Sequence, residues 1–141
     1  MKTSSIKTIV FWVITGFLCF ELVYGALWDF NVLNKGYVYG VLRHLGYPLY
    51  LGGILGVSKL LAMVVILAPG LKLAKEWAYA GVVILFLGGF VSHVCAGDAL
   101  SASVWSLAFG VIAIVSRILQ PANRSISAPV FSIRIKRNLS I

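Results

Sequence analysis

Three ionisable side chains stand inside long apolar stretches of this sequence. Glu21, Lys59 and His93 each lie within a hydrophobic run long enough to cross a lipid bilayer. A charge at the centre of a bilayer costs at least about 2.5–3.5 kcal/mol, so it is kept only where it has a partner or a role. A carboxylate and an ammonium can form an ion pair or carry a proton, and an imidazole can donate a hydrogen bond or hold a ligand. Together with Asp98, which follows the third run, these residues form the candidate polar set.

Each member of this polar set has a structural and a functional interpretation. The helical rise of 1.5 Å per residue places Glu21 and Lys59 at similar depths, so a structural ion pair is favoured over a proton-carrying acid. His93 is favoured as a packing residue, hydrogen-bonded to Tyr24 or to a neighbouring helix, over a ligand-binding residue. Asp98 is expected to cap the helix that follows it, because its side chain can accept a bond from a free backbone N–H.

The sequence gives little support to redox or metal chemistry. A b-type haem would need two histidines on facing helices, and the second histidine, His44, lies in a connector. Cys19 and Cys95 differ in depth by roughly 10 Å on the helical rise, too far for a disulfide, so we expect both to be buried apolar fillers. We predict no metal site and no catalytic residue, and among cofactors only a quinone stays open.

Four apolar stretches must position these side chains. A helix needs about 20 residues to cross a bilayer, and the stretches lack the alternation of a membrane barrel strand. Two of them stop at prolines, Pro69 and Pro121, which cannot continue a helix. The stretches cover residues 8–28, 49–68, 77–96 and 100–119. The sequence therefore predicts an all-α fold, an integral membrane four-helix bundle.

Small residues recur at helical spacing within these stretches, which is typical of helices that approach closely in a membrane. In the second stretch a GxxxG pair lies on the same stripe as Lys59, and in the third a row of mostly small residues lies beside His93. The glycines expected to support helix packing are Gly52, Gly56, Gly81, Gly88 and Gly110. We therefore expect a compact bundle with Lys59 and His93 lining its interior.

The distribution of positive charge predicts the orientation. The chain has 12 Lys and Arg against 4 Asp and Glu, and 60% of its residues are hydrophobic. One side of the predicted membrane carries only Lys35 and Arg43. The other side carries Lys2, Lys7, Lys72, Lys75, Arg117, Arg124, Arg134, Lys136 and Arg137. Because positive residues near spans stay in the cytoplasm, we predict that both termini are inside.

This orientation divides the chain into a cytoplasmic amino terminus at 1–7, a four-span domain at 8–120 and a basic cytoplasmic tail at 121–141. The basic residues are scattered, whereas a nucleic-acid-binding protein gathers them on one face. We therefore expect the lipid bilayer as the main partner, and no nucleic acid. The predicted location is a membrane that the chain crosses several times.

Two parts of the chain have alternative interpretations. The connector at 29–48 is long and rich in aromatic residues, so it is either an amphipathic helix at the membrane interface or a loop packed over the end of the bundle. The first stretch has the flanks of a cleaved signal peptide, with small residues near Gly25. The apolar run continues past that point, which favours a retained span.

Several short motifs resemble, in their order, the signature of the DoxX-like family. They are LGYP at 45–48, GVSKLL at 56–61, LAPG at 67–70, LAKEWAYAG at 73–81, SH at 92–93 and GD at 97–98. The resemblance covers about residues 10–120 and implies a small four-helix membrane protein, bacterial in most cases and of unassigned function in most. It therefore implies a location in a bacterial cytoplasmic membrane. Lys59 and His93 match the family pattern, whereas Trp28 stands where the family commonly has a lysine.

The family takes its name from a subunit of a thiosulfate:quinone oxidoreductase, and relatives are linked to membrane oxidoreductase complexes. The favoured hypothesis is a non-catalytic subunit or scaffold of a membrane complex, whose polar set is structural or frames a lipid or quinone site shared with a protein partner. A quinone-linked oxidoreductase subunit is the second. A small proton-coupled exporter is the third, suggested by a four-span chain with Glu21 in its first span, although the long first connector and the charge bias count against it.

Overall fold

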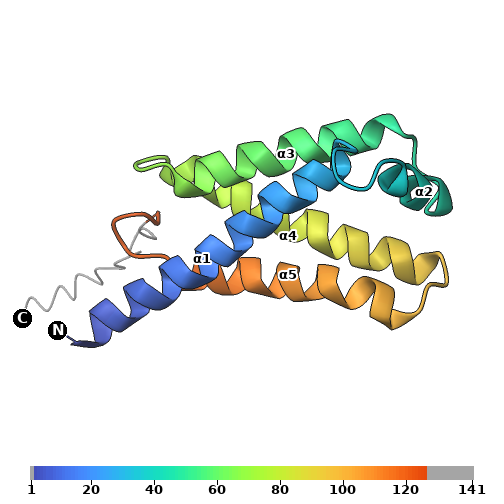
Figure 1. Cartoon of the computed structure of the whole chain (residues 1–141). Coiled ribbons are helices and arrows are strands. Elements are labelled where there is room, and N and C mark those ends of the chain that lie inside the picture. Colours follow the sequence, from blue (N-terminus) through green and yellow to red (C-terminus); the bar gives the residue numbers. More distant parts are fainter. Residues whose placement is uncertain (1, 127–141) are drawn as a thin grey trace, which may run out of the picture.

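The structure, a computed structural model, describes residues 2–126, and most of these residues are in helices. They are α1 (Lys2–Asp29), α2 (Tyr37–His44), α3 (Tyr50–Leu67), α4 (Lys72–Cys95) and α5 (Leu100–Leu119). Four of them, α1, α3, α4 and α5, are long and apolar enough to cross a membrane. The predicted all-α membrane bundle is confirmed (Figure 1). Residues 127–141 of the predicted basic tail lie outside the described range.

Two helices begin earlier than the apolar stretches indicated. Helix α1 already begins at Lys2, and α4 begins at Lys72 instead of residue 77. A helix does not need apolar residues to continue past the edge of a membrane, so composition marks the span and not the helix end. The turn between α3 and α4 therefore needs only residues 68–71, where Gly70 takes a positive φ of 79° that glycine adopts without strain.

The four long helices form a ring in which each contacts two neighbours. The order around the ring is α1, α3, α4 and α5, and α5 closes it against α1. Helix α1 runs obliquely across the other three, from α5 near its start to α3 near its end (Figure 1). The buried apolar cluster at the centre draws on all four helices and comprises Leu18, Cys19, Leu22, Ile66, Tyr79, Val82, Phe86 and Ala113.

A buried hydrogen-bond network joins three of these helices. The Ser116 hydroxyl on α5 lies 2.8 Å from the Thr15 hydroxyl on α1 and 2.8 Å from the Tyr79 hydroxyl on α4. Each interhelical hydrogen bond in a membrane contributes about 0.6–2 kcal/mol. The network therefore fixes how α1, α4 and α5 meet, while α3 stays outside it.

The carboxyl end of α3 is held by two basic side chains. Arg124 donates to the carbonyl oxygens of residues 66, 67 and 68 at 3.0, 2.8 and 3.2 Å, and the Lys75 ammonium donates to Ala68 as well. The Arg124 guanidinium also lies 4.9 Å from the centre of the Trp12 ring. The last carbonyls of a helix lack partners within it and carry a partial negative charge. The first residues after α5 thus dock on the bundle.

Candidate functional site

A groove of about 840 Å³ extends along α3 and α4. Its walls are mostly apolar, with Leu51, Leu55, Leu61, Ala62 and Val65 from α3 and Ala74, Trp77, Ala78, Val82, Ile84, Leu85 and Phe86 from α4. Helix α2 contributes Val38, Val41 and Leu42 at one end, which we call the α2 end. Small-molecule ligands commonly occupy clefts of about 300–1,000 Å³ with apolar walls and a few polar groups. The groove is therefore the candidate site.

Lys59 faces this groove in an ion pair, and its partner is Asp29. The Lys59 Nζ atom lies 2.6 Å from the Asp29 Oδ2 atom, and the two side chains are 12% and 11% exposed. The pair joins the last residue of α1 to the middle of α3. The expected partner was Glu21, and that expectation is corrected: Glu21 makes no ion pair within residues 2–126, although it also lines the groove.

The spacing along α1 explains the change of partner. Glu21, Gly25 and Asp29 follow one another at intervals of four residues, which places them on the same helix face. A Cβ atom added at Gly25 would lie 3.0 Å from the Lys59 ammonium and 3.6 Å from a Glu21 carboxyl oxygen. The ammonium therefore occupies the space that glycine leaves between two carboxyl groups, and it pairs with the one nearer the helix end. Sequence reasoning missed Asp29 because it assigned that residue to the connector.

The five glycines that were expected to support helix packing lie in two kinds of surroundings. An added Cβ at Gly52 would lie 2.8 Å from the Asp29 carbonyl oxygen, so the end of α1 approaches α3 closely there. At Gly56 it would lie 2.8 Å from the ring of Phe30, the residue after α1, which packs on α3. At Gly110 it would meet Phe86 at an ordinary 3.6 Å. At Gly81 and Gly88 it would meet no described atom within 4 Å. These last two glycines widen the groove instead of packing helices, which corrects the expectation.

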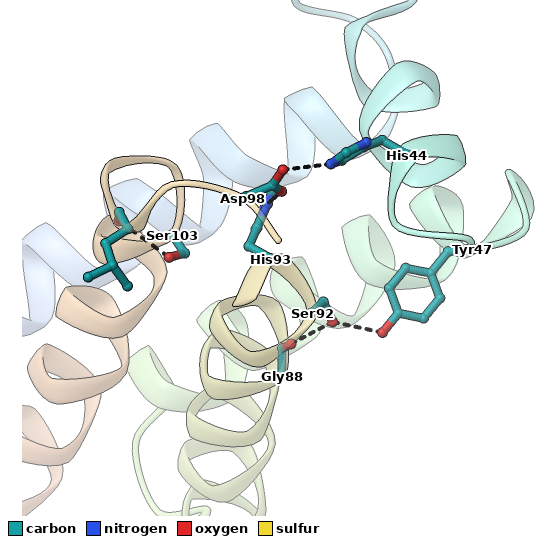
Figure 2. Close-up of polar contacts among 8 residues, drawn as sticks. His44, Tyr47, Gly88, Ser92, His93, Asp98 and Ser103 are labelled. Atoms are coloured by element: carbon teal, nitrogen blue, oxygen red, sulfur yellow. Dashed lines mark hydrogen bonds and ion pairs between the residues drawn. The ribbon is translucent and has the colours of Figure 1, made fainter. Parts of the chain in front are cut away.

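Asp98 bridges two histidines at the α2 end of the groove (Figure 2). One carboxylate oxygen lies 2.7 Å from His44 Nε2, and the other lies 2.7 Å from His93 Nδ1. A carboxylate only accepts hydrogen bonds, so each of these ring nitrogens carries a proton. The bridge joins the end of α2 to the end of α4. Because His44 and Asp98 are 54 positions apart, this contact depends on the fold and not on local spacing.

A second bridge lies beside the first. The Tyr47 hydroxyl is 2.8 Å from the Ser92 hydroxyl, and Ser92 itself donates to the carbonyl oxygen of Gly88 at 2.7 Å (Figure 2). Because the Ser92 proton is used in that bond, Tyr47 is the donor. Both Tyr47 and Ser92 line the groove. Two polar contacts therefore connect the α2 segment to α4 across the end of the groove.

These contacts correct several expectations for this end of the molecule. Asp98 does not cap α5, whose cap position is Ala99 without a side-chain hydrogen bond, because its carboxylate is engaged by the histidines. His93 bonds to Asp98 and not to Tyr24. The first connector contains a short helix that covers the end of the bundle, with Val38 and Leu42 buried. It therefore combines the two alternatives, an amphipathic helix and a segment packed over the bundle.

The two histidines hold the pKa of Asp98 below its ordinary value of 3.8, with the hydrogen bond from His93 as the largest cause and that from His44 next. A depressed pKa means that Asp98 stabilises the folded protein above pH 3.8, and that this contribution is lost as the pH falls through the folded value. We expect the Asp98 pKa to rise towards 3.8 in His93→Ala, and less in His44→Ala. NMR titration of the labelled carboxyl carbon measures it, and an unchanged pKa in both variants would contradict the assignment.

Neither cysteine lines this groove. Cys19 is buried as expected, whereas Cys95 is exposed, which corrects the expectation of two buried fillers; both are free thiols. Residues 2–126 hold no group of three or more His, Cys, Asp or Glu side chains placed to bind a metal ion. What the groove can offer a ligand is apolar contact, the paired Lys59, and hydrogen bonds at the α2 end.

Comparison with known proteins identifies the family. Neither curated proteins nor solved structures give a match. The DoxX-like family matches residues 13–116, a range that holds Glu21, Asp29, Lys59, both histidines and Asp98, as well as most of all four membrane-spanning helices. This match covers well over half of the 141 residues. The chain is therefore a multi-pass membrane protein that belongs to the DoxX-like family.

Proposed function

We propose that this protein is a non-catalytic subunit of a membrane complex that holds one amphiphilic molecule, a phospholipid or a quinone, in the groove between α3 and α4. The observation that carries the proposal is the groove itself, about 840 Å³ in volume and lined by apolar side chains over most of the length of α4. Polar groups are confined to one part of it, around Lys59 and the α2 end. An apolar chain with a polar headgroup matches that division.

The glycines of α4 support a ligand role over a purely structural one. Gly81 and Gly88 line the groove, and open space lies where their side chains would be. In a bundle held together only by packing, that space would be filled, because small residues in membrane helices serve to bring backbones together. Here they leave room along α4, and an acyl or isoprenoid chain could occupy it.

The polar groups allow either headgroup. Lys59 has three N–H donors, and one of them points at Asp29. The other two can reach a carbonyl or phosphate oxygen. His93 bonds to Asp98 through Nδ1, and its Nε2 atom is then an acceptor in the neutral ring. A quinone bound there would supply the redox chemistry, while Lys59 and His93 would bind and orient its ring.

Filling the groove tests the proposal. We expect the double variant Gly81→Leu and Gly88→Leu to lose about 90% of the amphiphile that copurifies in mild detergent. Each methylene displaced from an apolar site costs about 0.8 kcal/mol, so displacing two lowers the affinity about tenfold. The measurement is mass spectrometry of extracted lipids and quinones per mole of protein.

A matched control separates occlusion from damage to the fold. Gly53 lies on α3, is exposed, does not line the groove and has no described atom within 4 Å of an added Cβ. Gly53→Leu should therefore keep its bound amphiphile. The identity of the extracted molecule decides between phospholipid and quinone. Equal amounts of bound amphiphile in the groove-filled variant and in the control would refute the proposal.

The subunit role has its own test. Copurification in mild detergent, followed by mass spectrometry of bound proteins, should recover a membrane partner in a constant ratio to this chain. Recovery of the chain alone, with its amphiphile, would remove the subunit role and keep the binding role.

A further inference from the structure

The segment that covers the α2 end of the groove is attached differently on its two sides. On one side, Leu42 of α2 is buried and packs against α3, where its Cδ1 atom lies 3.5 Å from the Cβ position of Gly52. On the other side, α2 and α4 make no close backbone contact among the described residues. Among residues 2–126, two side-chain hydrogen bonds cross the gap, His44 to Asp98 and Tyr47 to Ser92.

The backbone on both sides of α2 is suited to movement. Gly36 directly precedes the helix with a φ of 91°, and Gly46 follows it with a φ of 77°. An added Cβ would meet no described atom within 4 Å at either glycine. The backbone N–H of each still donates one hydrogen bond, from Gly36 to Asn31 Oδ1 and from Gly46 to the Arg43 carbonyl oxygen, so these two bonds are the local contacts that a turn of the chain would break. Glycine crosses between backbone conformations more readily than other residues. The chain can thus turn on both sides of α2, and the second turning point, Gly46, directly precedes Tyr47.

We propose that residues 37–47 form a latch over the groove, with the His44–Asp98 and Tyr47–Ser92 bridges as its two closures, and that opening this latch admits the ligand at the α2 end. This inference rests on the proposed function for the identity of the ligand. It adds the place where the ligand enters the groove and the residues that control its entry. In the orientation predicted from the charges, the latch faces the outer leaflet.

The bridges are suited to this role because both are partly solvated. The His44 side chain is 54% exposed, and those of His93 and Asp98 are 22% and 20% exposed. In the second bridge, Tyr47 is 41% exposed. Water can therefore replace the protein partner when a bridge breaks, so opening leaves no buried polar group without a hydrogen bond. The Lys59–Asp29 pair, at 12% and 11%, lacks this property and stays closed when the latch opens.

Chemical labelling of a cysteine inside the groove tests the latch without any ligand. In a chain that carries Cys19→Ala and Cys95→Ala, the reporter is Leu55→Cys on α3, a groove residue. A small water-soluble thiol reagent is added to protein in nanodiscs. We expect the labelling rate to rise about fivefold in His44→Ala or Tyr47→Phe, and about thirtyfold when both are combined.

Two controls show whether a faster labelling rate is specific to the groove. Tyr39→Phe removes a hydroxyl from α2 that makes no hydrogen bond within the described residues, and it should leave the rate unchanged. The native Cys95 is exposed and does not line the groove, so its labelling in otherwise matched proteins should be the same with and without the bridges. A rise at Cys95 as large as at position 55 would indicate general loosening and would overturn the latch.

A cross-link provides the converse measurement. Tyr47→Cys and Ser92→Cys, joined by a short bifunctional thiol reagent, should suppress labelling at position 55 below the rate in the single variant Tyr47→Cys treated with the same reagent, which cannot form the cross-link. Unchanged labelling in both the double bridge variant and the cross-linked protein would refute the latch, even if the groove-filling variant loses its amphiphile. Conversely, latch-dependent labelling in a protein that never retains an amphiphile would uphold the latch and refute the proposed function.

Discussion

Replacing Lys59 by methionine lowers the free energy of unfolding by about 3–5 kcal/mol, the cost usually seen when one partner of a buried ion pair is removed. The substitution keeps the volume of the side chain but leaves the Asp29 carboxylate, 11% exposed, without its ammonium. Asp29→Asn should cost less than Lys59→Met, because the Lys59 ammonium, at 12% exposure, keeps the Glu21 carboxyl group nearby. Reversible unfolding in mixed detergent micelles measures both.

A double variant tests whether Lys59 and Asp29 interact directly. The double variant Lys59→Met with Asp29→Asn leaves no unpaired charge at this contact, so it should be more stable than either single variant, which is the signature of direct coupling. Glu21→Gln is the matched control, since Glu21 lies on the same face of α1 and makes no ion pair with Lys59. It should cost less than about 1 kcal/mol. Strong coupling of Lys59 to Glu21 and none to Asp29 would reverse the assignment.

The bundle could be predicted from the sequence because its cause is local. Each long helix corresponds to a continuous apolar run in the sequence, and a run of that length crosses a membrane as a helix. Prolines such as Pro69 mark where a run ends. The helix ends could not be predicted in the same way. Lys72 and Lys75 belong to α4 although they are charged, since hydropathy reports the membrane boundary and backbone hydrogen bonding sets the helix boundary.

The partners of the polar residues could not be predicted, because they depend on how the helices meet. Depth arithmetic found Lys59 and a carboxylate at matching heights, but two carboxylates share that face of α1, and only the fold selects Asp29. His44 looked like a connector residue, yet α2 brings it to Asp98 from 54 positions away. The spacing of His93 and Asp98 by five residues was a local signal that sequence reasoning read as a helix cap.

The glycines show the same limit within one residue type. Gly52 and Gly56 meet α1 and Phe30 closely, whereas Gly81 and Gly88 border open space, although both pairs belong to stripes of small residues. A stripe indicates that two backbones can approach, but it does not state whether they do. In this chain α1 approaches α3 closely at Gly52, whereas no described atom lies close to Gly81 and Gly88 on α4.

Gly52→Ala separates these two uses of glycine, and we expect it to lower the free energy of unfolding by about 1–3 kcal/mol, the usual cost of overpacking. The added methyl group would lie 2.8 Å from the Asp29 carbonyl oxygen, a backbone atom that cannot turn away. Helices α1 and α3 must therefore move apart, which also disturbs the Lys59–Asp29 pair. The free energy of unfolding in mixed micelles again provides the measurement.

The neighbouring glycine supplies the control for this substitution. Gly53 lies on the same helix, and an added Cβ there meets no described atom within 4 Å. Gly53→Ala should therefore stabilise the protein by up to about 1 kcal/mol, because alanine is the better helix former. The two adjacent substitutions are chemically identical, so opposite signs can arise only from the space around them. Equal effects of the two would mean that α1 does not approach α3 at Gly52, and the geometry that aligns Asp29 with Lys59 would fail with it.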